Sequence, residues 1–250
     1  MERLQDRICV VTGAGGIAAA AAARFAREGA TVFTVSIDAD QSAALHKELP
    51  DGEHGWAAAD LRSEDEAVSA FAACTARYGR IDSLFAVVGG SGRRFGDGPA
   101  DAIPLDGWQA TIDLNLTTTF LSVREALRQM TTQSPAGGSI VLTSSVLAEH
   151  PSPGRFTTHA YATAKGAQQA FVRTTAAHYA SAGIRINALA PGLVDTPMSA
   201  RAQLDEEITG YLARKQPLAG GIIPADDVAA AASFLLSDEA RYITGQVVSV

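Results

Sequence analysis

Short apolar runs rich in β-branched residues alternate with longer segments of helical periodicity along the chain. The apolar runs lie at residues 7–12, 31–36, 55–59, 81–88, 139–144 and 184–190. Helical spacing of apolar residues recurs at 17–28, 40–48, 63–78, 106–130, 159–181 and 225–236. Runs that are apolar on both faces suit parallel strands covered by helices on each side. The alternation predicts an α/β fold, a Rossmann-type doubly wound three-layer sandwich with a mostly parallel central sheet of about seven strands.

Size and composition agree with one globular domain. The 250 residues are 47% hydrophobic and 19% charged, which excludes a disordered chain, collagen and a small disulfide scaffold. The formal net charge is −7 and no run of Lys and Arg interrupts it, so nucleic acid is not an expected partner. Because α/β folds of this length often form one unit, we expect a single dinucleotide-binding and catalytic domain over residues 1–250.

The cysteines and the N-terminus indicate where such a chain works. Cys9 lies in an apolar run and Cys74 in a helical pattern, and their spacing does not resemble a metal site. We therefore expect reduced thiols and no bound metal. The first seven residues alternate in charge, and no early apolar run approaches the roughly 20 residues of a membrane span. These features predict a cytoplasmic protein without a membrane partner.

A glycine-rich turn follows the first expected strand and leads into the first expected helix. It reads Thr12-Gly13-Ala14-Gly15-Gly16-Ile17-Ala18, a form of the dinucleotide fingerprint with alanine in the last place. Glycines let the backbone approach a pyrophosphate, and the free N–H groups of a helix N-terminus favour the anion. Glycines in such a turn can also be purely structural. Its position between the first strand and the first helix is what favours nucleotide binding.

The end of the second expected strand bears on which nucleotide binds. Asp38 follows Ser36 there, and an acid about 20 residues after the glycines often binds the ribose hydroxyls of NAD. Neither the glycine turn nor residues 36–40 contain the Arg or Lys that would accommodate the phosphate of NADP. We expect NAD, with NADP as the open alternative. Asp60 and Leu61, just past the third strand, would contact the adenine ring, or Asp60 would instead cap the following helix.

An ordered series of motifs resembles the short-chain dehydrogenase/reductase family over essentially the whole chain. The most specific is Tyr161-Ala162-Thr163-Ala164-Lys165, which matches the family's Tyr-x-x-x-Lys and follows Ser144-Ser145 in the sequence. Further matches are Asn115 between two leucines, residues 184–192, Thr196, and residues 242–246. One such motif would be chance, whereas the series in this order is specific.

The resemblance implies an oxidoreductase that transfers a hydride between a nicotinamide cofactor and a secondary alcohol or ketone. It assigns the substrate oxygen to Ser145, which precedes a small apolar pair, and proton transfer to Tyr161. Lys165 would lower the tyrosine pKa and hold the nicotinamide ribose, and Asn115 would hold a water in a proton relay. The cofactor contacts that it implies are Thr12, Gly13, Gly15, Gly16, Ile17, Ser36, Asp38, Asp60, Leu61, Val88, Gly89, Tyr161, Lys165, Pro191, Gly192, Val194 and Thr196.

The pair of Tyr161 and Lys165 also has a physical argument of its own. Residues four apart lie one above the other on a helix face. A cation about 4 Å from a phenolate, at an effective dielectric of about 20, contributes on the order of 4 kcal/mol, or roughly 3 pKa units. We therefore expect the pKa of Tyr161 to fall from about 10 to near 7. The alternative is a chance pair with a half-buried tyrosine and a solvated lysine.

The chain departs from the family pattern at four places. The glycine turn is one residue shorter than usual, and Ala86-Val87-Val88-Gly89 replaces the usual Asn-Asn-Ala-Gly after the fourth strand. The interval from Ser145 to Tyr161 is longer than usual, and the sequence ends at Val250, where the family usually continues. Because the missing amides would brace the central strands, cofactor affinity is the property that we expect these departures to affect most.

Two irregular segments bear on the substrate. The longer interval contains His150, Arg155 and His159, and Arg93-Arg94 lies in the segment after the fourth strand. They suggest a polar or anionic substrate such as a sugar derivative or a hydroxy acid, with solvated surface arginines as the alternative. The resemblance implies a substrate lid at about 193–217, whose apolar residues would exclude water.

The resemblance further implies a homotetramer in which helices 106–130 and 159–181 pack against symmetry mates. Two other functions stay open from the sequence. One is an NADP-dependent reductase of 3-oxoacyl-type ketones. The other is a catalytically silent nucleotide-binding scaffold, although such a protein would have no physical need for Ser145, Tyr161 and Lys165 together.

Overall fold

A computed structural model of the protein describes residues 2–152 and 154–250. Within them, one seven-stranded sheet has the order β3-β2-β1-β4-β5-β6-β7, and every neighbouring pair is parallel. The strands are β1 (Ile8–Thr12), β2 (Thr31–Ser36), β3 (Gly55–Ala58), β4 (Ser83–Ala86), β5 (Gly138–Thr143), β6 (Ile184–Ala190) and β7 (Val247–Ser249). The predicted doubly wound α/β fold is confirmed.

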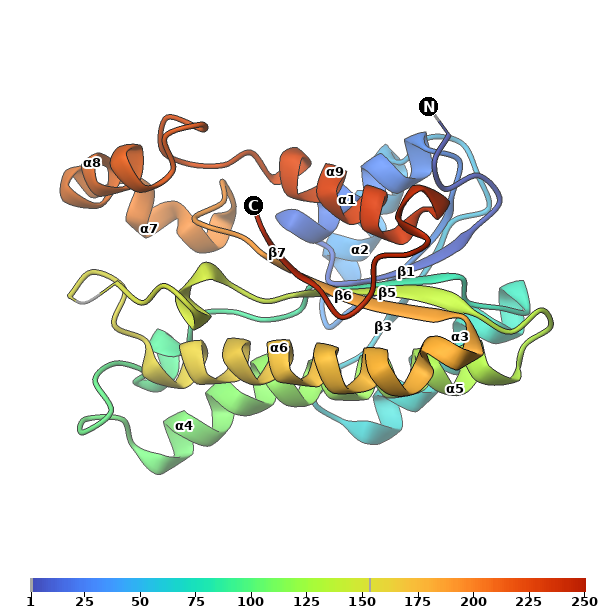
Figure 1. The fold of residues 1–250 in the computed structure, drawn as a ribbon, viewed down its shortest axis with the longest axis horizontal. Coiled ribbons are helices and arrows are strands. Elements are labelled where there is room, and N and C mark those ends of the chain that lie inside the picture. The colour runs from blue at the N-terminus through green and yellow to red at the C-terminus, as the bar shows by residue number, and fades with distance from the viewer. Residues whose placement is uncertain (1, 153) are drawn as a thin grey trace.

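Helices cover both faces of this sheet and give three layers (Figure 1). One face carries α1 (Ile17–Arg27), α2 (Ala39–Glu48) and α9 (Ala225–Leu236). The other face carries α3 (Glu64–Tyr78), α4 (Leu105–Ile112), α5 (Thr118–Thr132) and α6 (His159–Tyr179). Two short helices, α7 (Ala200–Gln203) and α8 (Glu206–Lys215), lie beyond the end of the sheet, on the left in Figure 1.

The period of two in the strands divides the core into two apolar clusters. Val10 and Ile140 point to the cluster beneath α3, α5 and α6, whereas their neighbours Val11 and Val141 point to the cluster beneath α1 and α9. All four side chains are almost fully buried. Strands that are apolar on both faces therefore require helices on both faces, which is the arrangement observed.

The expected helix over residues 106–130 is interrupted. α4 ends at Ile112, a π-helical turn spans Asp113–Thr117, and α5 begins at Thr118. Asn115 sits in this turn and is fully buried, with Nδ2 donating to the Thr111 carbonyl at 2.9 Å. Apolar periodicity cannot reveal one extra residue in a turn, and such turns often accompany functional sites.

Both cysteines lie in the apolar core. Cys9 and Cys74 are buried free thiols, and burial raises the pKa of each to about 12, so both are unreactive at neutral pH. Among the described helices, none is both long enough and apolar enough to span a bilayer.

Candidate active site

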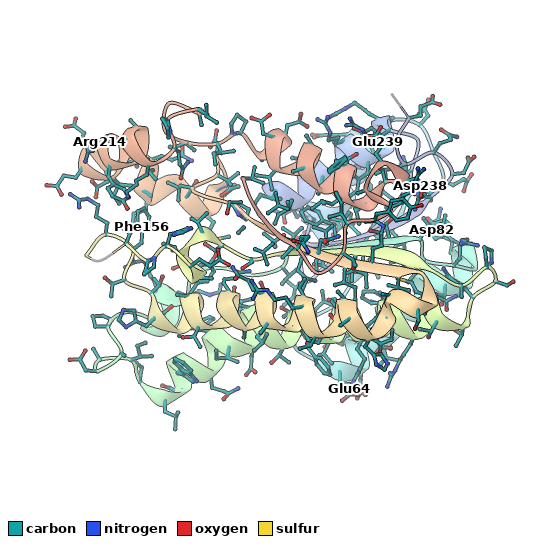
Figure 2. All side chains as sticks on the ribbon, in the orientation of Figure 1. Glu64, Asp82, Phe156, Arg214, Asp238 and Glu239 are labelled. Atoms are coloured by element: carbon teal, nitrogen blue, oxygen red, sulfur yellow. The ribbon has the colours of Figure 1, made fainter. Side chains whose placement is uncertain are left out.

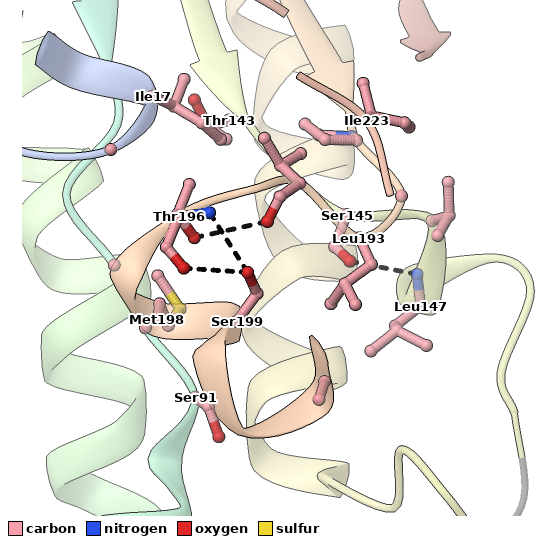
Figure 3. A pocket seen from close by; sticks show the side chains of 18 of the residues that line it. Ile17, Ser91, Thr143, Ser145, Leu147, Leu193, Thr196, Met198, Ser199 and Ile223 are labelled. Atoms are coloured by element: carbon pink, nitrogen blue, oxygen red, sulfur yellow. Dashed lines mark hydrogen bonds between the residues drawn. The ribbon is translucent and has the colours of Figure 1, made fainter. Parts of the chain in front are cut away.

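A cavity of about 1300 Å³ lies where the strands end at their carboxyl edge. Parallel strands with crossover helices bring the loops after β1, β4, β5 and β6 to this edge, and ligands bind there in open α/β sheets. Figure 3 shows part of the lining, from Ile17 at the start of α1 to Ser145 after β5 and Thr196 after β6. The predicted residues that line it are Thr12, Gly13, Gly15, Gly16, Ile17, Ser36, Val88, Gly89, Ser145, Tyr161, Lys165, Pro191, Gly192, Val194 and Thr196.

The glycine turn has the geometry that glycine alone adopts easily. Gly13 has φ of 97° and Gly16 has φ of 54°, both in the left-handed region. A Cβ on Gly16 would lie 3.0 Å from the Thr196 Cγ2 atom, so the turn also meets the segment after β6 closely. No side chain caps α1 at Gly16. Ala18 N donates to the Gly15 carbonyl at 3.1 Å, but no side chain competes for the other N–H groups of this first turn, which can face an anion in the cavity.

Two side chains brace the region where the family motif carries asparagines. Thr12 Oγ1 accepts hydrogen bonds from Val87 N at 2.9 Å and from Val88 N at 3.1 Å, which ties β1 to the segment after β4. Asn115 Oδ1 accepts from Gly90 N at 2.9 Å, and its Nδ2 donates to Gly90 O at 3.0 Å. The chain thus holds this segment in place although the usual amides are absent.

A carboxylate from another element fixes the start of α6. Asp97 Oδ1 accepts from Ala160 N and Asp97 Oδ2 from Tyr161 N, both at 3.0 Å, and the side chain is buried. The first N–H groups of a helix lack partners within it, so Asp97 acts as an N-cap supplied from the segment after β4. No local pattern in the sequence points to Asp97, because the helix that it caps begins about sixty residues later.

Lys165 lies one helical turn after Tyr161, and its charge is buried. Its Nζ donates to the Thr143 carbonyl at 2.6 Å and lies 5.6 Å from the centroid of the Tyr161 ring. The residue is 3% exposed, and burial lowers the pKa of the ammonium to about 7. A Cβ on Gly89 would come within 3.2 Å of Nζ, so glycine there leaves the space that the lysine occupies.

The structure corrects the expected pKa of Tyr161. Burial raises the pKa of its phenol above the ordinary value, and the hydrogen bond with Ser145 offsets only part of that. The expectation was wrong because it placed the ammonium about 4 Å away and treated it as permanently charged. Lys165 instead loses its proton easily. At neutral pH Tyr161 is therefore protonated, the form that can give a proton to a substrate oxygen.

Neighbouring serines have different roles in this site. Ser144 Oγ donates to the Lys165 carbonyl at 2.9 Å and accepts from Gln169 Nε2 at 3.3 Å, so its hydroxyl is used in packing α6 against β5. Ser145 Oγ accepts from Leu147 N at 3.2 Å, and the Ser145 hydroxyl lies near enough to Tyr161 to lower the pKa of that phenol. This arrangement favours Ser145 as the group that meets the substrate.

Four predicted residues lie outside the cavity lining, and Asn115 is one of them. The main-chain carbonyl oxygen of Asn115 accepts from Gln168 Nε2 at 2.8 Å and from Thr119 Oγ1 at 2.8 Å. A carbonyl has two lone pairs, so both are in use and a water would have to displace one donor. Asn115 therefore positions the Gly90 segment in this structure.

The other three lie around β2 and β3. Asp38 is exposed and caps α2, where it accepts from Gln41 N at 2.8 Å. Asp60 pairs with Arg62 at 2.6 Å, which lowers the pKa of Asp60, and α3 is capped by Ser63 instead. Leu61 is 3% exposed in the core. Gln41, which belongs to no motif in the sequence, lines the cavity beside Gly15.

The donor set fits a dinucleotide. The cavity joins the uncapped turn of α1 to the ammonium of Lys165, whose Nζ has one acceptor among the described residues. Thr143 Oγ1 is buried in the same lining and lacks a hydrogen-bond partner among them. In the described part of the chain, no three His, Cys, Asp or Glu side chains are grouped to hold a metal ion.

Known proteins resemble this chain over its full length. The family profile described as "Enoyl-(Acyl carrier protein) reductase" matches residues 11–250. The chain is 33% identical to the cis-4-hydroxycyclohexanecarboxylate dehydrogenase of Sinomonas cyclohexanicum, covering 100% of this chain and 96% of that protein. It is 32% identical to a 3-oxoacyl-[acyl-carrier-protein] reductase of Thermotoga maritima, covering 99% and 97%. A solved short-chain type dehydrogenase/reductase from Mycobacterium ulcerans superposes with a TM-score of 0.89 at 32% identity, covering 98% of this chain and 88% of that one.

Proposed function

The chain belongs to the short-chain dehydrogenase/reductase family, and we propose that it interconverts a secondary alcohol and a ketone through Ser145, Tyr161 and Lys165. Family membership makes it an oxidoreductase that acts on CH–OH groups with a nicotinamide cofactor. The observation that carries the assignment of residues is the cavity itself. It joins the uncapped glycine turn to the Tyr161 phenol and the Lys165 ammonium in one space.

The chemistry follows from the two protonation states. A nicotinamide cofactor held between the glycine turn and Lys165 would supply the hydride for reduction of the ketone, or take it up in oxidation of the alcohol. In reduction, Tyr161 Oη gives its proton to the substrate oxygen, and Ser145 Oγ holds that oxygen by a hydrogen bond. A phenolate at Tyr161 favours the protonated form of the nearby Lys165, and the resulting ammonium stabilises the phenolate. In oxidation the proton returns from the alcohol to Tyr161.

We propose NAD as the cofactor. Ser36 and Gln41 line the adenosine end of the cavity, and both are neutral. The glycine turn and residues 36–40 contain no Arg or Lys to pair with a 2′-phosphate. Since a missing ion pair is worth about tenfold in affinity or more, kcat/KM with NAD should exceed that with NADP by about that factor.

Residues 193–217 form the proposed lid of the single domain over residues 1–250. Leu193, Met198, Tyr211 and Leu212 line the cavity, which supports a role in excluding water from the substrate. Leu204 is 87% exposed and takes no part in the lining.

Assembly and location are also proposals. Phe120 on α5 is 43% exposed and lies 6.3 Å from the ring of Phe171 on α6, which supports a homotetramer built through these two helices. Light scattering should give four times the mass of the chain, and a monomer mass would count against this. The two buried free thiols support work in the reducing cytoplasm.

A turnover assay tests the proposed activity. The purified protein is offered secondary alcohols, including a hydroxycyclohexanecarboxylate, with NAD or NADP, and a 3-oxoacyl thioester with the reduced cofactors. We expect formation of reduced cofactor from an alcohol with NAD. A preference for the thioester with NADPH would favour the acyl reductase instead. Tight cofactor binding without turnover on any compound would favour a silent scaffold.

A further inference from the structure

The outer part of the cavity carries cationic side chains from three elements. Arg93 follows β4, Arg201 lies on α7 and Lys215 ends α8, and all three line the cavity. None of them forms an ion pair with a described carboxylate. Among the described lining residues, Asp227 has the one acidic side chain, and it lies in the first turn of α9, which packs against α1. The charge in the outer cavity is therefore opposite to the net charge of −7 on the whole chain.

Arg93 and Arg201 face a common space. The segment after β4 and the segment after β6 approach each other where a Cβ on Gly90 would lie 3.9 Å from Met198 Sδ. Arg93 donates from Nη2 to the Arg155 carbonyl at 3.3 Å, which leaves the rest of its guanidinium without a charged partner. Burial lowers the pKa of Arg93, and the charge of Arg201 lowers it further, as expected of two cations near each other, whereas the Asp97 carboxylate, which forms no ion pair with Arg93, acts in the opposite direction.

The neighbouring Arg155, unlike Arg93 and Arg201, has both a carboxylate and an aromatic partner. It pairs with Glu207 on α8 at 3.3 Å and lies 5.7 Å from the centroid of the Tyr211 ring. Phe156, labelled in Figure 2, lies 6.4 Å from the same ring and lines the cavity. The outer cavity therefore offers aromatic surface next to Arg93 and Arg201, which have no carboxylate in an ion pair among the described residues.

We infer that Arg93 and Arg201 bind a carboxylate on the substrate, so that the protein acts on alcohols or ketones whose apolar body ends in an acid group. This inference rests on the proposed function. Guanidinium groups bind carboxylates through paired, charge-assisted hydrogen bonds, and the approach of an anion offsets the repulsion between two cations. The apolar body would lie against Phe156 and Tyr211, and the reacting carbon would lie toward Ser145 and Tyr161.

Binding of a matched pair of compounds tests the inference without turnover. The NAD-saturated protein is titrated by calorimetry with cyclohexanecarboxylate and with cyclohexanecarboxamide, which has nearly the same shape and no charge. We expect the carboxylate to bind at least about tenfold more tightly. Arg93→Gln and Arg201→Gln should each weaken the carboxylate by several-fold and leave the amide unchanged.

Arg94→Gln is the matched control, because Arg94 does not line the cavity and its guanidinium lies 4.6 Å from the Phe95 ring centroid. It should change neither affinity. Equal affinity of the wild-type protein for acid and amide, or no binding of the acid, would overturn the inference. So would tighter binding of inorganic phosphate than of the carboxylate.

The same titration separates this inference from the proposed function. Tyr161→Phe should bind the carboxylate as the wild-type protein does, because the phenol oxygen takes no part in holding the acid group. If the protein binds the acid tightly but turns over no compound, the result supports the anion site and contradicts the proposed reaction. Unchanged melting temperature and NAD affinity in the two Arg variants show that a lost affinity is local.

Discussion

Lys165 shows how far a residue's chemistry depends on its surroundings. Its type and its spacing from Tyr161 were readable from the sequence, and both predicted the same helical face. Its burial was not readable, because the covering atoms come from β5 and from the segment after β4. Burial brings the pKa of Lys165 to about 7, and the burial of Tyr161 itself raises the pKa of the phenol. A Coulomb argument from two residues therefore fails without the desolvation of both.

The buried charge gives the unliganded protein a characteristic stability against pH. Between about pH 7 and its ordinary pKa of 10.5, Lys165 is deprotonated in the folded chain and protonated in the unfolded chain. The unfolded chain then binds more protons, so stability rises with pH in this window. The difference in unfolding free energy between the wild-type protein and Lys165→Met should shift in favour of the wild type from about pH 7 to about pH 9.

Urea unfolding at several pH values measures this difference. Lys47→Met is the matched control, since Lys47 is exposed on α2, and its difference from the wild type should not change with pH. A flat difference for Lys165→Met over the same range would contradict the buried, readily deprotonated lysine.

Predictions that depended on neighbouring residues fared differently from predictions that depended on a residue's position in the sequence. The glycine turn and the Tyr161–Lys165 pair depend on neighbours within one turn, and they lie in the cavity. Asp38 was assigned by its distance from the glycine turn and Asp60 by its position after the third strand, and each is held instead by a neighbour along the chain. Competition from local hydrogen bonds is what spacing alone could not show.

At the scale of the element, helix α6 depends on a carboxylate outside it. Asp97→Ala would leave two N–H groups at the start of α6 without acceptors and should cost about 1–3 kcal/mol of stability. Because Tyr161 N is one of these donors, kcat should also fall, while the KM for the cofactor changes little. Asp97→Asn keeps one oxygen acceptor, so its stability and its kcat should lie between those of the wild-type protein and Asp97→Ala.

Ser63→Ala is the comparison for this variant. Ser63 caps α3, which lies away from the cavity lining, so its loss should cost about 1 kcal/mol without a change in kcat. Urea unfolding and steady-state kinetics on the three variants decide the matter. An equal effect of Asp97→Ala and Ser63→Ala on kcat would show that Asp97 stabilises the fold and does not position Tyr161.

The boundaries of an element were predictable where residues typical of helix ends flank it. The helix expected over residues 225–236 has those bounds in the structure, after Pro224 and before Ser237. The strand expected over 81–88 is shorter, because Val87 and Val88 donate to Thr12 Oγ1 and leave the ladder of β4. The π-helical turn at Asp113–Thr117 depends on contacts with α6 and the segment after β4, which no single window contains.

For the whole molecule, the order of elements determined where the site would lie. Alternating strands and helices predict a carboxyl edge where loops far apart in sequence meet, and the cavity lies there. The distribution of charge was not predictable in the same way. A chain of net charge −7 gathers Arg93, Arg201 and Lys215 at one cavity, and only the fold brings them together.

One deuterium atom tests the central claim most directly. The best alcohol from the turnover assay is labelled with deuterium at the carbinol carbon and incubated with oxidised cofactor, and the reduced cofactor is analysed by mass spectrometry. We predict that the label appears on the nicotinamide ring with the wild-type protein. With Tyr161→Phe the transfer should be slower by about 10² or more at unchanged cofactor affinity. Transfer at the wild-type rate by Tyr161→Phe, or release of the label to water, would contradict the account.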